Sequence, residues 1–180
     1  DNNDMNHSHR VGLEITSVCS AFDSDFTESE SELIELESVS LYSIFVFPKN
    51  QKRTEEEITY HYEHLLQEDA RPLLDIRNYS VAEYRHARKV SDIAYKYARV
   101  LGLKAELAAT AGLYYRLGRI EGEPVVENGI LLAEKYCFPL DIIEILKEYG
   151  GEKNLPSTPE SALVHMIDTV SLKIELLDKQ

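Results

Sequence analysis

The 180-residue chain has no tryptophan, two cysteines and no long hydrophobic run. Cys19 and Cys137 are too few for a disulfide framework and favour a reducing compartment. The longest apolar stretch, residues 39–47, contains two serines and is about half as long as a membrane span. We therefore expect that the chain does not itself span a membrane. We also expect a cytoplasmic location, which includes the cytosolic face of a membrane-anchored protein. Because the sequence begins with Asp1 and ends within an expected helix, we interpret it as part of a longer protein.

Basic residues are also scarce. The chain has 32 acids and 19 lysines plus arginines, a formal net charge of −13 and a pI of about 4.9. Such a surface repels phosphate backbones and anionic lipid, so we expect no DNA partner. Hydrophobic residues make up 43% of the chain, enough to form a full core.

The acids are concentrated near the start of the chain. Residues 23–37 carry seven acids and no base, which predicts a solvated loop, or alternatively the exposed face of a short helix. The flanking stretches 11–19 and 39–47 have strand-like patterns. We expect residues 1–53 to form an acidic, partly mobile extension with a small β-hairpin or irregular structure.

From Thr54 onward the patterns are helical. The sequence Thr54-Glu55-Glu56-Glu57 is typical of a capping box that begins a helix running towards Pro72. Further helices are predicted over about 80–101, 104–117, 124–136 and 139–150, and from a second capping box at 157–160 to the end. Cys137, next to Phe138, is expected to be buried. The fold class is therefore mainly α, a helical bundle over residues 54–180.

Several segments, in this order, resemble the HD phosphohydrolase superfamily, in particular the His-Asp-Ile-Gly subgroup found in ribonuclease Y and in seven-transmembrane cyclic-di-AMP phosphodiesterases. Residues 111–119 are similar to the family's Ala-Gly-Leu-Leu-His-Asp-Ile-Gly-Lys, and residues 84–90 to the stretch with the first metal histidine. Residues 125–129, 148–151 and 166–171 match later motif segments. The resemblance covers about residues 64–175 and implies an HD-like helical bundle.

In that family, histidines and aspartates hold paired divalent metals that activate water for attack on a phosphoester. Carried over by position, His86 and Asp168 are kept, whereas the other ligand positions have become Tyr115, Arg116, Val125, Tyr149 and Gly150. Two protein ligands cannot fix a di-metal centre, and a guanidinium does not act as a ligand. The resemblance therefore implies an inactive hydrolytic site, with no catalytic residue, metal or other cofactor expected.

Loss of the metals would leave Asp168 without a cation in a partly buried site, at a cost of several kcal/mol. We therefore predict that Arg116 forms a salt bridge with Asp168 near His86, with the charged groups within about 6 Å. His86 itself is expected to be a hydrogen-bonded helix histidine.

The main functional expectation is an inactive HD-type domain that acts as a regulatory or protein-interaction module, binding a protein partner or itself. One alternative is a sensor that binds a nucleotide or cyclic dinucleotide without hydrolysis, with Lys89, Arg116, Arg119 and His165 as candidate ligand-binding residues. Another is a residual phosphohydrolase that holds Mn, Mg or Fe through His86, His165 and Asp168. His61 and His64 are interpreted as a surface pair rather than a zinc site.

Overall fold

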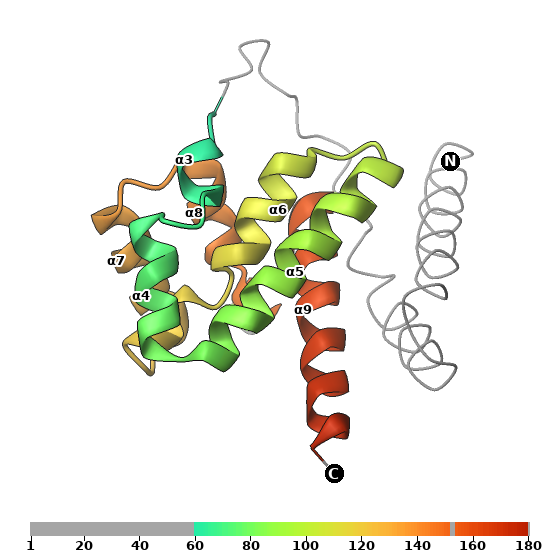
Figure 1. The fold of residues 1–180 in the computed structure, drawn as a ribbon. Helices are drawn as coiled ribbons and strands as arrows, with labels where there is room; N and C mark the ends of the chain where they lie inside the picture. Colours follow the sequence, from blue (N-terminus) through green and yellow to red (C-terminus); the bar gives the residue numbers. More distant parts are fainter. Residues whose placement is uncertain (1–59, 152–153, 180) are drawn as a thin grey trace, which may run out of the picture.

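The computed structural model describes residues 60–151 and 154–179, which form a bundle of helices (Figure 1). The elements are α3 (Glu63–Leu66), α4 (Arg71–Tyr79), α5 (Val81–Val100), α6 (Ala105–Tyr114), the 3₁₀ helix η2 (Leu117–Ile120), α7 (Val125–Lys135), α8 (Leu140–Leu146), the 3₁₀ helix η3 (Tyr149–Gly151) and α9 (Pro159–Asp178). The predicted mainly α fold is confirmed in these ranges. The expected hairpin and the capping box at Thr54 lie outside the described residues. No helix within the described ranges is both long and apolar enough to cross a membrane.

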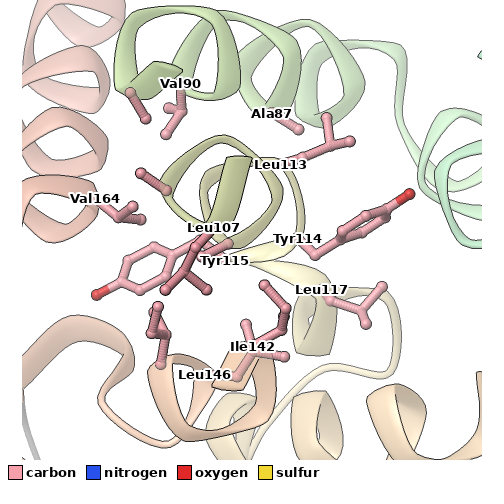
Figure 2. Packing of buried hydrophobic residues seen from close by; sticks show 14 of the residues in the cluster. Ala87, Val90, Leu107, Leu113, Tyr114, Tyr115, Leu117, Ile142, Leu146 and Val164 are labelled. Carbon is pink, nitrogen blue, oxygen red and sulfur yellow. The ribbon is translucent and has the colours of Figure 1, made fainter. Parts of the chain in front are cut away.

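Helix α6 is the centre of the bundle. Every residue from Leu107 to Tyr114 is buried, and α5, α8 and α9 pack around this helix (Figure 2). Its small residues allow close approach, because a Cβ added at Gly112 would lie only 3.1 Å from the Val90 side chain. At the end of α6, the side chains of Tyr114 and Tyr115 point in opposite directions (Figure 2). The chain therefore delivers consecutive side chains to different parts of the core.

The second predicted capping box is wrong in its residues. Thr158, not Ser157, is the N-cap of α9, and its hydroxyl accepts a hydrogen bond from the Ser161 amide at 3.2 Å. Glu160 does not reach back to its own cap. Its carboxylate instead accepts from the Lys104 amide, at the start of α6, at 3.1 Å. The acid of the pattern thus ties two helices together.

The helix expected to run from Thr54 towards Pro72 is also not found as predicted. Helix α3 ends at Leu66, and Pro72 lies in the first turn of α4 instead of ending a helix. A proline at the beginning of a helix sacrifices no intrahelical hydrogen bond, because the first amides have no partner there.

The expectation that Cys137 is buried is wrong. Cys137 is exposed and has a left-handed φ of 55°, whereas its neighbour Phe138 is 5% exposed. The turn after α7 directs the aromatic ring inward and the thiol outward.

Helix α7 packs closely against η2. A Cβ at Gly118 would lie 1.9 Å from the Val125 carbonyl oxygen and 2.7 Å from the Gly129 amide nitrogen, so only glycine fits. This contact fixes the course of the chain directly after Arg116.

Candidate functional site

His86 lies in the core between two carboxylates. The ring, 4% exposed, is on α5, and its Nε2 is 2.7 Å from Asp168 Oδ1 on α9. On the other side, Nδ1 is 2.8 Å from Glu175 Oε1, which lies further along α9. Both ring nitrogens can donate to carboxylates only when the ring carries two protons. The geometry therefore favours the imidazolium form, and it confirms His86 as a hydrogen-bonded helix histidine.

The electrostatic setting of His86 agrees with this. Burial alone lowers the pKa of the ring, because it penalises the charged form. The hydrogen bonds and negative charges of Asp168 and Glu175 outweigh burial and raise the pKa above its ordinary value. An imidazolium has no lone pair to offer, so in this state His86 cannot bind a metal ion.

Arg116 continues this arrangement from the end of α6. Its Nε and Nη2 donate to the two oxygens of Glu83, each at 3.1 Å, a bidentate pair. Its Nη1 lies 4.0 Å from Asp168 Oδ2, so the predicted Arg116–Asp168 salt bridge is confirmed. Glu83 is nevertheless the closer partner. Arg119 binds the same Glu83 carboxylate, Nε to Oε1, at 3.0 Å.

Glu83 stays ionised in this environment. Burial raises the pKa of its carboxyl, but the hydrogen bond and charge of Arg116, together with the charges of Arg119 and His86, outweigh burial and hold the pKa below its ordinary value.

We call these six connected side chains the His86 network: Glu83, His86, Arg116, Arg119, Asp168 and Glu175. Three carboxylates face two guanidiniums and one imidazole, so the charges balance when the imidazole is protonated. A balanced, hydrogen-bonded cluster avoids the cost of an unpaired charge in the core. The network thus needs no further cation.

Two members of the network, Glu83 and Glu175, were not predicted from the sequence. Glu83 precedes His86 by three residues on one helix, and Glu175 follows Asp168 by seven residues on another, so both share a helical face with a predicted site residue. This helical spacing was the sequence signal that could have identified both glutamates.

Tyr115, beside Arg116 in sequence, forms no ion pair with the described residues and makes its hydrogen bonds with His165 and the backbone of Gly150. Its hydroxyl accepts from the Gly150 amide and lies 3.2 Å from His165 Nδ1, while its ring meets Tyr149 edge to face at 5.1 Å between centroids. Burial lowers the pKa of His165, with Asp168 partly opposing it. A neutral His165 with its proton on Nε2 can accept a hydrogen bond from the Tyr115 hydroxyl at Nδ1. Tyr115 therefore occupies a histidine position of the resembled motif, where its ring fills the space and its hydroxyl makes hydrogen bonds.

The other predicted positions lie elsewhere. Val125 begins α7 and packs through its carbonyl against Gly118. Lys89 is half-buried on α5, and His61 and His64 are exposed near α3. Among the described residues, no group of three or more histidine, cysteine, aspartate or glutamate side chains is arranged to hold a metal ion.

A small pocket borders the His86 network between α4, α5, α6 and η2. Glu83, His86, Arg116 and Arg119 form its polar wall, and Lys89 is not among its lining residues. Its volume is about 10 Å³, room for about one water molecule.

Part of the chain is similar to a known enzyme. It is 36% identical over 92 residues to ribonuclease Y of Finegoldia magna, an alignment that covers 48% of this chain and 18% of that enzyme. The chain thus corresponds to less than a fifth of the length of that relative. No family model and no solved structure matches the chain.

Proposed function

We propose that the helical part of this chain is a degenerate HD-type domain that does not hydrolyse phosphoesters and serves as a regulatory or protein-interaction module. The observation that carries the proposal is the occupation of both His86 ring nitrogens by carboxylates, at 2.7 and 2.8 Å. The similarity to ribonuclease Y supports the HD-type ancestry.

Charge is the main obstacle to a hydrolytic centre at this site. A di-metal centre brings several positive charges into a cluster of carboxylates and neutral imidazoles. Here Arg116 lies 4.0 Å from Asp168 and is held by Glu83. To bind a metal, His86 would have to lose a proton and leave one of its carboxylates, and the ion would have to tolerate a fixed guanidinium beside it.

A sensor that binds nucleotide phosphate is less well supported. An anion site needs donors with unused positive charge, whereas Arg116 and Arg119 both donate to Glu83. The pocket beside them is small, and the charged side chains of its wall are already paired within the His86 network. A protein-interaction module is therefore better supported than a nucleotide sensor.

The first experiment measures metal binding and phosphodiester hydrolysis on the same purified protein. We expect purified protein to bind no stoichiometric Mn²⁺ or Mg²⁺ in equilibrium dialysis, to show no shift in melting temperature with these ions, and to leave bis-p-nitrophenyl phosphate intact. The double variant Tyr115→His/Arg116→Asp should also stay inactive, because Val125 and Tyr149 still occupy ligand positions of the motif.

The same samples discriminate the alternatives. Stoichiometric Mn²⁺ that is lost in Asp168→Ala would contradict the proposal and favour a phosphohydrolase. Stabilisation by millimolar cyclic dinucleotide, lost in Arg119→Ala, would favour a sensor, since a ligand that binds only the folded state raises its stability. Concentration-dependent self-association in sedimentation velocity, with neither of these effects, is the result expected for an interaction module.

A further inference from the structure

The outward face of α5 is basic in an otherwise acidic chain. Five bases lie along it at helical spacing, separated by one acid, Asp92, and we call this set the α5 basic face: Arg85, Arg88, Lys89, Lys96 and Arg99. Arg85, Lys96 and Arg99 are exposed, while Arg88 and Lys89 are half-buried. This local excess of bases contrasts with the net charge of −13 of the chain as a whole.

Two of the arginines on this face make weak contacts at the surface. Arg88 reaches Glu68 at 3.8 Å, but the Glu68 side chain is 85% exposed, and such a pair contributes little. Arg99 lies over the ring of Tyr95, 5.8 Å from its centroid. Tyr95 is itself 40% exposed, so an aromatic surface lies among the positive charges.

We propose that the α5 basic face binds the acidic segment 23–37 of the same chain. That segment carries seven acids and no base, and it also contains apolar residues that suit the surface of Tyr95: Phe26, Leu33, Ile34 and Leu36. The five bases and the seven acids are complementary in charge. The contact is independent of whether the His86 network can bind a metal.

The dimensions permit a contact within one chain. From Arg85 to Arg99, α5 extends about 21 Å at 1.5 Å per residue, and fifteen residues cover about 22 Å even as an α-helix. The 22 residues between the segment and Tyr60 can span up to about 75 Å. An intramolecular contact is also favoured by the high effective concentration that a covalent connection provides.

Zero-length carbodiimide cross-linking of the 180-residue chain tests the proposal, because it joins lysine amines to carboxylates in direct contact. We expect cross-links from Lys89 and Lys96 to acids within 23–37, read by peptide mass spectrometry. A mixture of ¹⁴N- and ¹⁵N-labelled protein should give them within single chains. Their yield should fall as salt shortens the screening length from about 10 Å at 0.1 M to about 3 Å at 1 M.

The decisive variant is Arg85→Glu/Arg99→Glu, which reverses two exposed charges and leaves both lysines in place. We expect about a tenfold lower cross-link yield, because each reversal replaces attraction by repulsion. The matched control, Lys135→Glu/Lys179→Glu, reverses two exposed charges outside α5 and should keep the wild-type yield. Circular dichroism verifies that both variants remain helical.

Three results would overturn the proposal. They are an absence of these cross-links in the wild-type chain, a yield that the α5 reversal does not reduce, and cross-links found only between ¹⁴N and ¹⁵N chains. The last result would assign the face to a second copy of the protein.

Discussion

His86 and His165 lie in the same core, near the same aspartate, but their pKa values are shifted in opposite directions. The pKa of His86 is raised and that of His165 is lowered. Burial lowers the pKa of both rings. At His86, carboxylates at hydrogen-bond distance on both sides reverse this effect, whereas His165 has the Tyr115 hydroxyl at 3.2 Å and only the more distant charge of Asp168. Direct partners rather than burial decide which histidine carries a charge.

The same contrast separates Tyr115 from Arg116, which are adjacent in sequence at the end of α6. Arg116 joins a balanced ionic cluster, and Tyr115 joins neutral hydrogen bonds with Gly150 and His165. In the resembled motif this dipeptide is His-Asp. Both replacements thus fit the places that they occupy, one by charge and the other by volume.

The largest effect is expected on the ionic side. Asp168→Asn keeps the side-chain volume but removes the carboxylate that faces both His86 and Arg116. Breaking a buried pair in this way costs about 3–5 kcal/mol of unfolding free energy. Asp178→Asn, an exposed change on the same helix, is the control. Urea denaturation measures both, and a loss under about 1 kcal/mol in Asp168→Asn would contradict the assigned role.

A smaller effect is expected from pH. The folded-state pKa of His86 is raised, so its contribution is complete below the unfolded-state value of about 6.5 and is lost as pH rises through the folded value. The folded-state pKa of His165 is lowered, so stability falls as pH drops below about 6.5 and protonation favours the unfolded chain. If the pKa of one ring differs by one between the folded and the unfolded chain, the free energy of unfolding changes by about 1.4 kcal/mol.

The two histidine variants separate these contributions. His86→Gln should flatten the stability profile above pH 6.5, and His165→Gln should flatten it below that pH, both measured by urea midpoints from about pH 5 to 9. Identical profiles of stability against pH in the two variants would contradict the opposite pKa shifts of His86 and His165.

The smallest effect is expected at Tyr115. Tyr115→Phe removes one hydroxyl that accepts from Gly150 and lies beside His165, at a cost of about 1 kcal/mol. Tyr79→Phe, at a residue that is 49% exposed, should change stability much less. Equal losses in thermal melts would mean that the Tyr115 hydroxyl contributes nothing specific.

Much of this arrangement follows from the sequence, and the rest depends on packing. Helical spacing predicted α5, and proline and capping signals predicted α7 and α9. The exchange of a motif aspartate for Arg116 predicted its pairing with Asp168. The role of Glu83 was missed because its nearness to Arg116 arises only when α5 packs against the end of α6. A local pattern shows which face a residue shares, but not which helix meets that face.

Glu160 illustrates the same limit. Its position three residues after a serine is typical of a capping box, which is a purely local signal. Its carboxylate instead accepts from Lys104, 56 residues away in sequence, because the beginnings of α6 and α9 lie together. Tertiary contacts thus redirected a residue that the pattern had assigned to its own helix.

The doubly protonated state of His86, held between Asp168 and Glu175, makes the ring unavailable to a metal. Nitrogen-detected NMR of ¹⁵N-histidine-labelled protein at pH 7, with His86→Gln for assignment, tests this state most directly. We predict that both ring nitrogens of His86 carry protons and that their signals do not change when Zn²⁺, a diamagnetic probe, is added. A bare ring nitrogen at His86 that shifts with stoichiometric Zn²⁺ would contradict it.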